Sequence, residues 1–558
     1  MSDNILFIVP PPIRYPDYIN PAENTKTHEK NGKVYGHLVT EMPLGIIALS
    51  AYIKKHTDAK TKLIDFSVIL NAMPDFPYDN YADFFDWYMS QEEIKAFKPT
   101  IIGISVLFSP AYPMLIDLAT ICRKIYKDAL IVSGGSIPQN MYQKIFDDLQ
   151  ALDAVNSIDA LCYGEGEKPL LALVQAEDKH QYLKESRSWI TVEKKDSEGF
   201  VHDLIEDLDE IPFYDYDICD MEKYSLNPSI TTFYAQDEEA PKTVNFQVMT
   251  SRGCPYHCTF CASHTVHGRN MRYFSVERIR EDFQTLRNKY GAKQFIFQDD
   301  HLMGDIDRVY EIIEIIKNLK DVRPVFQNGL AMYALTREML EKLVECGVEQ
   351  LTLPVESGNS RVLKQLMKKP LKLDIIRRVT DDCRDLGIYT NLNLLIGMPG
   401  ETKDDIQESI DFLKTLNSNW FVVMFATPLV GSEMLEVCIE NGYLTENFVD
   451  TDYKKVIVKT EHLTPEEIYT NVYSMNLQLN FVENPDYRLG EYETALLGLK
   501  GALIAKRDHA FAHYYSAKCY EKLGDSAQAE AHFASAKKII DNSPFWKGYA
   551  DKFNLEIN

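Results

Sequence analysis

Three cysteines lie within eight residues of one another and form the strongest chemical signal in the chain. They are Cys254, Cys258 and Cys261, spaced C-x3-C-x2-C in the segment S-R-G-C-P-Y-H-C-T-F-C. Three thiolates on one short loop can bind three irons of a cubic iron–sulfur cluster and leave the fourth iron open for a substrate or cofactor. The alternative is a tetrahedral zinc site completed by a histidine. The candidate histidines are His257, His264 and His267.

The remaining composition is that of a folded, acidic protein. The chain has 558 residues, of which 45% are hydrophobic and 25% are charged. Its net charge of -24 disfavours binding to nucleic acids and to anionic membranes. The seven cysteines outside the cluster are too scattered for a disulfide scaffold.

No targeting or membrane segment is predicted. Residues 1–9 contain an apolar stretch but lack a preceding basic region and a following cleavage site. The most apolar long window, residues 101–121, is interrupted by Pro110, Pro113 and Asp117. We therefore expect a cytoplasmic protein whose thiols stay reduced.

Residues 1–175 alternate short apolar runs with helical patterns. The runs are nearly continuous in Ile, Leu and Val, as in strands that are buried on both faces. Expected strands cover residues 5–9, 63–66, 101–106, 130–132 and 160–163, and expected helices cover 44–55, 92–97, 114–126 and 141–149. This alternation predicts an α/β, doubly wound, Rossmann-like domain with a parallel sheet.

Glycine-rich turns follow two of these strands. Such sheets bind ligands beyond the carboxyl ends of their strands, where glycine allows a close backbone approach. The candidate cofactor-binding residues are Gly134, Gly135, Gly164, Glu165 and Gly166. A plain tight turn at Gly134-Gly135 is the alternative. Because no G-x-G-x-x-G follows the first strand, a dinucleotide site has little support.

A second alternating region follows a connector over residues 176–240. Expected strands cover residues 244–249, 294–298, 325–328, 350–355, 389–396 and 421–425, and expected helices cover 276–289, 308–318, 337–346, 360–368, 373–386 and 403–416. Six strand–helix units over residues 241–440 predict a partial (β/α)6 barrel with its site at the carboxyl ends of the strands. An open sheet is the alternative.

After a second connector, residues 441–469, the tail over 470–558 carries an internal repeat. Leu489, Gly490, Ala495 and Ala502 recur 34 residues later as Leu523, Gly524, Ala529 and Ala536. This helical period resembles tetratricopeptide (TPR) repeats. Two copies are too few for independent stability, so we expect them to dock on the body. A helical bundle with a coincidental period is the alternative.

The cysteine loop, with Phe260 before the third cysteine, resembles the signature of radical S-adenosylmethionine (SAM) enzymes. Three further segments resemble motifs of the same superfamily at the ends of the last three predicted strands: E-S-G-N at 356–359, I-G-M-P-G-E-T at 396–402 and P-L-V-G-S at 428–432. The resemblance implies a [4Fe-4S] cluster held by the three cysteines, with SAM bound at the open iron.

The first half resembles the cobalamin-binding radical SAM proteins. The segments that carry this resemblance are M-P-L-G at 42–45, Gly134-Gly135, Y-G-E-G-E at 163–167 and L-D-E-I-P at 208–212. It implies cobalamin as a further cofactor. The D-x-H-x-x-G motif that supplies a cobalt-ligating histidine in many cobalamin proteins is absent from residues 1–175. A domain that has lost cobalamin is the alternative.

The resemblance also implies an activity. Reductive cleavage of SAM would generate a 5′-deoxyadenosyl radical, and methylcobalamin would then methylate an unactivated carbon. The alternatives are radical cyclisation, rearrangement or carbon–carbon coupling in natural-product, lipid or cofactor biosynthesis, and a non-catalytic sensor or scaffold. Methylthio transfer is disfavoured, because Cys122, Cys162 and Cys219 are too dispersed for a second cluster.

Further site residues follow from the resemblance. Phe260 would lie near the adenine or serve as a core aromatic. Glu356 would bond the SAM ribose or amine, or form an ion pair with a lysine or arginine. Asp299 and Asp300 would contact the SAM amino group, or one of them would cap the next helix. Ser357 and Asn393 are weaker candidates.

The implied partners are a one-electron reductant such as flavodoxin or ferredoxin, and a small-molecule or carrier- or peptide-bound substrate. A further protein partner would bind the C-terminal repeats. No nucleic acid is expected.

Overall fold

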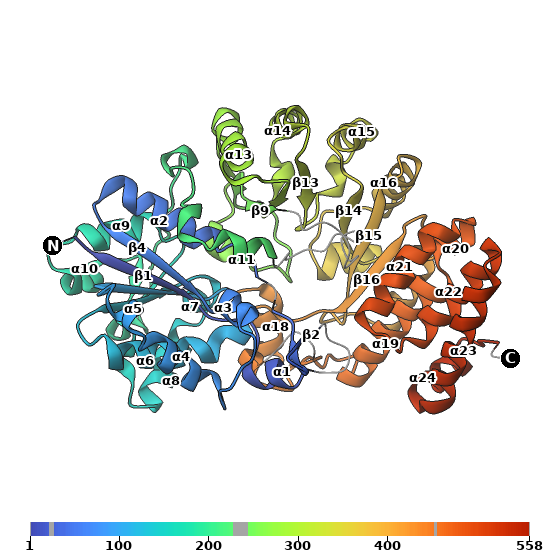
Figure 1. Ribbon diagram of the computed structural model, residues 1–558, viewed down its shortest axis with the longest axis horizontal. Coiled ribbons are helices and arrows are strands. Elements are labelled where there is room, and N and C mark those ends of the chain that lie inside the picture. The colour runs from blue at the N-terminus through green and yellow to red at the C-terminus, as the bar shows by residue number, and fades with distance from the viewer. Residues whose placement is uncertain (1, 22–26, 39, 227–243, 451–454, 557–558) are drawn as a thin grey trace.

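The computed structural model describes residues 2–21, 27–38, 40–226, 244–450 and 455–556. Its N-terminal part is built on a six-stranded sheet at one end of the molecule (Figure 1). In spatial order the strands are β4 (Lys60–Asp65), β1 (Asn4–Val9), β5 (Ile101–Ser105), β6 (Leu130–Gly134), β7 (Ala160–Cys162) and β8 (Trp189–Ile190). The first five are parallel, as predicted. Strand β8 pairs antiparallel with β7 and lies within the predicted connector.

Helices cover both faces of this sheet. Leu6 and Ile8 of β1 pack into one apolar core with α4 (Tyr81–Met89), α6 (Tyr112–Ile125) and α8 (Tyr142–Ala151). Ile5 and Phe7 pack into another core with α2 (Leu44–His56) and α9 (Glu167–Gln175). Because successive strand residues point to opposite faces, both must be apolar, which explains the continuous runs in the sequence. The sheet is therefore doubly wound.

The central part is an arc of six parallel strands in chain order. One half pairs β9 (Asn245–Val248), β12 (Gln294–Phe297) and β13 (Arg323–Phe326), and the other pairs β14 (Gln350–Glu356), β15 (Tyr389–Ile396) and β16 (Trp420–Phe425). The helices α13 (Val276–Tyr290), α14 (Ile306–Leu319), α15 (Arg337–Glu345) and α16 (Leu373–Asp385) fan over its outside (Figure 1). Helix α17 (Lys403–Leu413) follows β15. The segment predicted as a helix over residues 360–368 is instead mostly π-helical, at Val362–Leu366.

The tail consists of helices that pack beside β16. They are α19 (Pro465–Leu477), the π-helical turn η11 (Gln478–Val482), α20 (Pro485–Leu489), α21 (Tyr492–Ala505), α22 (Ala510–Leu523), α23 (Ser526–Asn542) and α24 (Pro544–Lys552). The repeated glycines Gly490 and Gly524 both end a helix in the left-handed conformation. The 34-residue period therefore marks equivalent helix ends.

The tail docks on the central part through buried polar contacts. Asn480 in η11 accepts the Phe421 N–H at 2.8 Å and donates to the Phe421 carbonyl at 2.7 Å. It thus pairs with Phe421 at the outer edge of β16, which no other strand of the described residues covers. Arg384 of α16 pairs with Asp486 of α20 at 2.5 Å.

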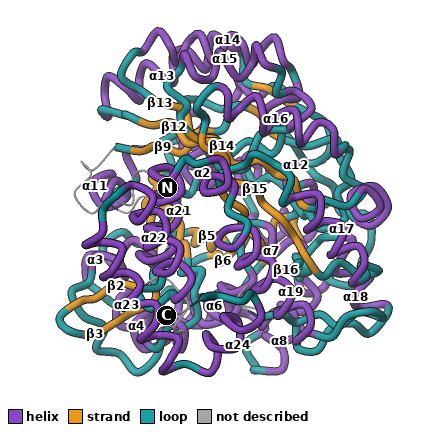
Figure 2. Tube along the Cα trace, turned by 90° about the vertical axis from the view of Figure 1, so that its right-hand side faces the viewer, coloured by secondary structure: helices purple, strands orange, loops and turns teal. Residues whose placement is uncertain are grey.

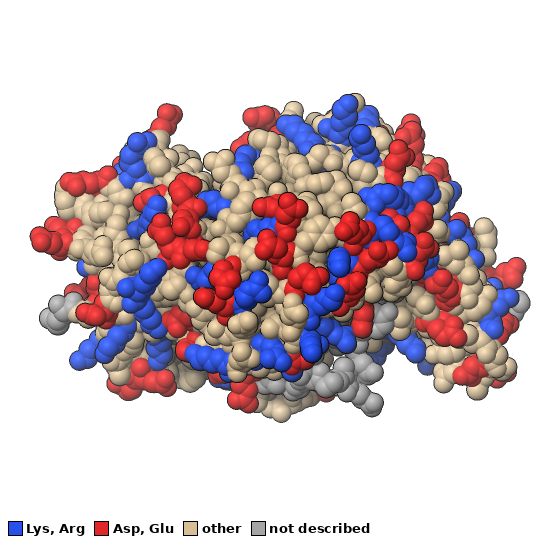
Figure 3. Space-filling model, turned by 90° about the horizontal axis from the view of Figure 1, so that it is seen from above, with Lys and Arg blue, Asp and Glu red and all other residues tan. Residues whose placement is uncertain are grey.

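Seen from the tail side, α13 and α14 lie at one end of the molecule and α24 at the other (Figure 2). Acidic and basic side chains are interspersed over the face seen from above (Figure 3). Among the described residues, no helix has the length and apolar character needed to cross a bilayer.

Candidate active site

The cysteine loop lies at the carboxyl end of β9. It is framed by the short antiparallel strands β10 (Ser251–Arg252) and β11 (Arg272–Tyr273), with the helical turn α12 (His264–His267) between them. The Thr259 N–H donates to the Met367 carbonyl at 3.1 Å, and the Met434 N–H donates to the Thr259 carbonyl at 2.8 Å. The loop is therefore held to segments that follow β14 and β16, across the mouth of the arc.

All three loop cysteines are partly buried free thiols. Burial raises the pKa of Cys258 to about 11, and the charge of Lys369 opposes that rise. Within the described parts of the chain, no three His, Cys, Asp or Glu side chains come together as the ligands of a single metal ion. Cluster-binding thiolates each bind a separate iron, so they need not converge on one point, and three thiols on one loop fit a cluster.

Asp299 binds the two residues that lead from β9 into the cysteine loop, Thr250 and Ser251. Its carboxylate accepts hydrogen bonds from the Thr250 hydroxyl at 2.7 Å and the Ser251 hydroxyl at 2.6 Å, and from the Thr250 N–H at 3.1 Å. Arg308 donates to the Thr250 carbonyl. Asp299 is buried and fully engaged, so it positions the strand that leads into the loop.

Asp300 contacts the loop itself. It accepts the Gly253 N–H at 3.2 Å and lies 2.7 Å from Nδ1 of His267. Helix α14 is capped instead by Asp305, whose carboxylate accepts the Arg308 N–H. The prediction that Asp299 or Asp300 caps this helix is therefore wrong.

At the end of β14, Glu356 forms the predicted alternative, an ion pair with a lysine. Its carboxylate lies 3.1 Å from the Lys369 ammonium, which also lies 5.9 Å from the centroid of the Phe260 ring. Glu356 follows a β-bulge and has a φ of 65°, an uncommon conformation for a side chain of this size. Phe260 packs partly buried against the central core.

Ser357 follows β14 and is fully buried, and its hydroxyl accepts the Asn359 N–H at 3.1 Å. Asn393 lies in β15 between Pro354 and Val422 of the neighbouring strands, on the face opposite the buried Leu392. It therefore lines the inside of the arc.

The inside of the arc carries uncharged polar groups that sequence reasoning missed. Gln298 donates to Gln327 at 3.0 Å, and Gln327 donates to Glu41 of the N-terminal part at 3.0 Å. The Met42 N–H donates to the side chain of Gln247 at 3.3 Å. In the sequence, a glutamine that alternates with apolar residues along a strand indicates a polar position on one face of the sheet. This alternation would have identified these residues. The segment before α2 thus reaches the lining of the arc.

Two glycine-containing loops of the N-terminal sheet face the cysteine loop. Gly135 has a φ of 107°, and a Cβ there would lie 2.5 Å from the Val106 carbonyl oxygen, so only glycine fits. The short helix α7 (Ser136–Asn140) begins after it, and Asn140 donates to the Thr265 hydroxyl of α12 at 3.0 Å. Gly164 donates its N–H to Gln139 of α7 at 2.9 Å.

Glu165, predicted to bind a cofactor, lies instead in a buried ionic network. It pairs with Arg272 at 2.5 Å and with Arg252 at 3.0 Å, and Arg252 also pairs with Glu167 at 2.8 Å. Burial by itself would raise the pKa of Glu165. The charges of Arg252 and Arg272 together have the larger, opposite effect, and the resulting pKa is about 2. The network joins the loop after β7 to both strands that frame the cysteine loop. Gly166 follows as the residue before α9.

Leu107 and Phe108 form an apolar surface beside these loops. They follow β5 at the carboxyl edge of the N-terminal sheet and are 54% and 48% exposed. Large exposed apolar side chains at this edge are typical of a ligand site.

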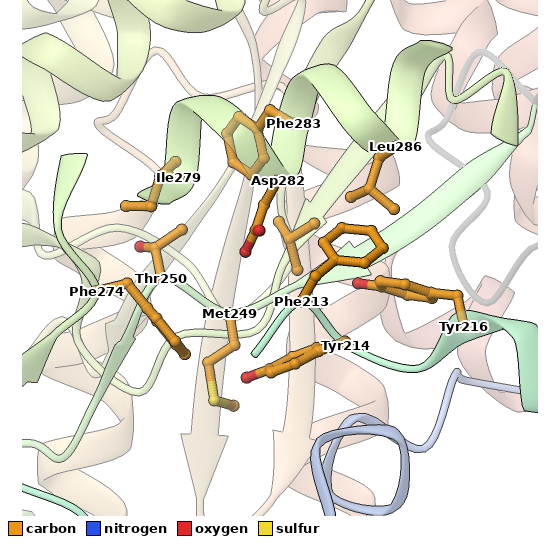
Figure 4. Close-up of a pocket in the computed structure, with 11 residues that line it drawn as sticks. Phe213, Tyr214, Tyr216, Met249, Thr250, Phe274, Ile279, Asp282, Phe283 and Leu286 are labelled. Atoms are coloured by element: carbon orange, nitrogen blue, oxygen red, sulfur yellow. The ribbon is translucent and has the colours of Figure 1, made fainter. Parts of the chain in front are cut away.

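A small cavity lies between α13 and the end of β9. Aromatic side chains, Tyr214 among them, line much of it, and Asp282 of α13 is its acidic residue (Figure 4). Burial raises the pKa of Asp282, which pairs with Arg278 at 2.7 Å. The cavity belongs to the packing between α13 and residues 205–220.

Comparison with known proteins identifies the class of enzyme to which this site belongs. Residues 248–413 match the model of the radical SAM superfamily. The chain is 27% identical over 463 residues to cytidylyl-2-hydroxyethylphosphonate methyltransferase of Streptomyces wedmorensis, covering 75% of this chain and 82% of the relative. The chain therefore contains a radical SAM domain and is an enzyme that uses a [4Fe-4S] cluster and SAM, as the cysteine loop predicted.

Two solved structures share the fold over nearly the whole chain. The cobalamin-dependent SAM radical enzyme OxsB with bound aqua-cobalamin matches with a TM-score of 0.63 and 15% identity, over 99% of this chain and 80% of that one. The radical SAM methyltransferase TsrM of Kitasatospora setae, with cobalamin and a [4Fe-4S] cluster bound, matches with a TM-score of 0.55 and 14% identity, over 97% and 99%. At this identity the likeness concerns the fold alone.

Proposed function

We propose that the protein is a cobalamin-dependent radical SAM methyltransferase that acts on an unactivated carbon. The observation that carries the proposal is the position of the cysteine loop. The loop lies at the carboxyl edge of the arc and faces the carboxyl edge of the N-terminal sheet through α7 and the ionic network. Two cofactors bound at these edges would lie next to one substrate space.

The cluster site is built by Cys254, Cys258 and Cys261. When bound, the cluster and SAM supply a 5′-deoxyadenosyl radical for hydrogen abstraction. The chain positions this chemistry: Asp299 fixes the strand before the loop, Asp300 fixes the loop backbone, and Glu356 stands at the end of β14. The lining formed by Gln298, Gln327 and Asn393 would orient an uncharged polar part of the substrate by hydrogen bonds.

The cobalamin site is proposed at the carboxyl edge of the N-terminal sheet. Leu107 and Phe108 offer apolar contacts for the ring system, beside the turn formed by Gly134 and Gly135. When bound, methylcobalamin supplies the methyl group for the substrate. The proposed site lacks the usual histidine motif, so the chain would hold cobalamin without a histidine ligand.

The first test replaces all three loop cysteines with alanine in the full-length protein. The native protein, reconstituted anaerobically, should bind iron and sulfide and cleave SAM under a strong reductant. A methyltransferase of this type should form both 5′-deoxyadenosine and S-adenosylhomocysteine, whereas a cyclase should form only the first. Full iron content and SAM cleavage in the alanine variant would refute the cluster assignment.

The second test concerns cobalamin. Leu107→Glu should weaken retention of hydroxocobalamin, measured by the corrin absorption that co-elutes with the protein in gel filtration. Leu152→Glu is the matched control, because Leu152 is 63% exposed but lies just after α8, before β7 begins. Equal retention by both variants would refute the site.

We propose that the tail mainly covers the edge of β16, and that its TPR-like period reflects stacked helices. We also propose that the protein works in the cytoplasm and that flavodoxin or ferredoxin is its electron donor. A reducing compartment suits both the oxygen-sensitive cluster and the free thiols.

A further inference from the structure

Lys369 places a positive charge against the cysteine loop. Its ammonium lies 3.1 Å from a carboxylate oxygen of Glu356 and 5.9 Å from the centroid of the Phe260 ring. The same charge acts on the sulfur of Cys258. The side chains of Lys369 and Glu356 are only 16% and 11% exposed, so solvent screens their charges weakly.

The backbone holds this lysine close to the loop. Thr259 lies between Cys258 and Phe260, and its hydroxyl donates to the Leu366 carbonyl at 2.7 Å. The Lys369 N–H donates to the Leu363 carbonyl at 2.8 Å and closes the π-helical segment. The segment that carries Lys369 is thus tied to the loop by Thr259, and the ion pair with Glu356 fixes the ammonium at the end of β14.

We propose that Lys369 raises the reduction potential of the iron–sulfur cluster, and that Glu356 holds its ammonium in place. The inference rests on the proposed function in one respect, that the cysteines hold the cluster. One-electron reduction adds negative charge to the cluster, and a fixed cation nearby stabilises that charge. Lys369 exchanges no electron or proton in this role, and it acts on the cluster only through the electric field of its charge.

The adjacent lysine offers a matched control. Lys368 is 49% exposed and pairs with Glu433 at 2.6 Å, so its charge is directed to a different partner and to solvent. A charge lost at position 368 removes the same formal charge from the chain at a neighbouring position. The two lysines therefore separate a local effect on the cluster from a general effect of net charge.

The experiment is a potentiometric titration of the reconstituted, full-length protein, monitored by the electron paramagnetic resonance signal of the reduced cluster. Lys369→Met should lower the midpoint potential, Lys369→Arg should stay close to the native value, and Lys368→Met should leave it unchanged. A native midpoint potential in Lys369→Met, with full iron content, would overturn the inference.

A second variant covers the case in which Lys369→Met loses its cluster. Glu356→Gln keeps a side-chain oxygen that can still accept from the ammonium but removes the compensating negative charge, so the midpoint potential should rise. An unchanged or lowered potential in Glu356→Gln would count against the inference. Failure of the proposed function is distinguishable, because the native protein would then bind no iron and give no signal to titrate.

Discussion

Replacing Glu165 with glutamine should destabilise the protein strongly, because it strands a buried charge. Arg272 contacts Glu165 at 2.5 and 2.9 Å, and its other partners are the carbonyls of Ile205 at 2.6 Å and His267 at 3.0 Å. Without Glu165, Arg272 has no carboxylate among its contacts. Removal of one partner from a buried pair typically costs about 3–5 kcal/mol.

The same geometry predicts an order among variants. Glu167→Gln should cost less, since Arg252 would keep its contact with Glu165 at 3.0 Å. Asp217→Asn is an exposed control, because Asp217 and Lys289 are 64% and 53% exposed; such pairs are worth about 0–1 kcal/mol.

Urea unfolding at pH 7 would measure all three variants. The pKa of Glu165 is depressed to about 2, so its stabilisation is present above the ordinary carboxyl pKa and is lost as the pH falls through about 2. Glu165→Gln should therefore lose stability at pH 7 and show a flatter acid limb. The reasoning is refuted if Glu165→Gln costs no more than Glu167→Gln, or less than about 1 kcal/mol.

Two further predictions concern buried groups outside the cluster site. Burial raises the pKa of Glu401 to about 7, so its contribution to stability falls as the pH rises from the ordinary carboxyl range through 7. Glu401→Gln should flatten this loss, by no more than roughly 3 kcal/mol, when unfolding is measured at pH 5 and pH 8; an unchanged pH dependence would contradict it. Asn480→Ala should cost about 2–4 kcal/mol, because it leaves a donor and an acceptor of Phe421 unpaired. Asn542→Ala removes only an exposed bond to Lys538, and should be nearly neutral in the same urea assay.

The alternation of strands and helices was predictable because each element has its own local period of apolar residues. Strand β15 has the predicted bounds, Tyr389–Ile396, because glycines at positions 387 and 397 bound the segment on both sides. Strand β8 was missed because two residues carry no period. The π-helical turn at Val362–Leu366 was also missed, because such turns resemble ordinary helices in sequence.

The cysteine trio was predictable for a similar reason. Its three thiols lie within one loop, so their spacing predicted an iron–sulfur cluster or a zinc site, and the resemblance to radical SAM enzymes favoured the cluster. The roles of the acidic residues were less accessible. Asp299 supports the loop and Glu356 pairs with Lys369, and neither partner could be chosen by counting residues along the chain.

By itself, the sequence determined the order of strands and helices, the three-cysteine loop and the glycines that close contacts require. Only the tertiary structure decided which charges meet. Arg272 and Glu165 are separated by 107 residues, and Gln327 and Glu41 by 286. The physical reason is that a buried charge or amide is stable only beside its partner, and that partner is brought there by packing between separate parts of the chain.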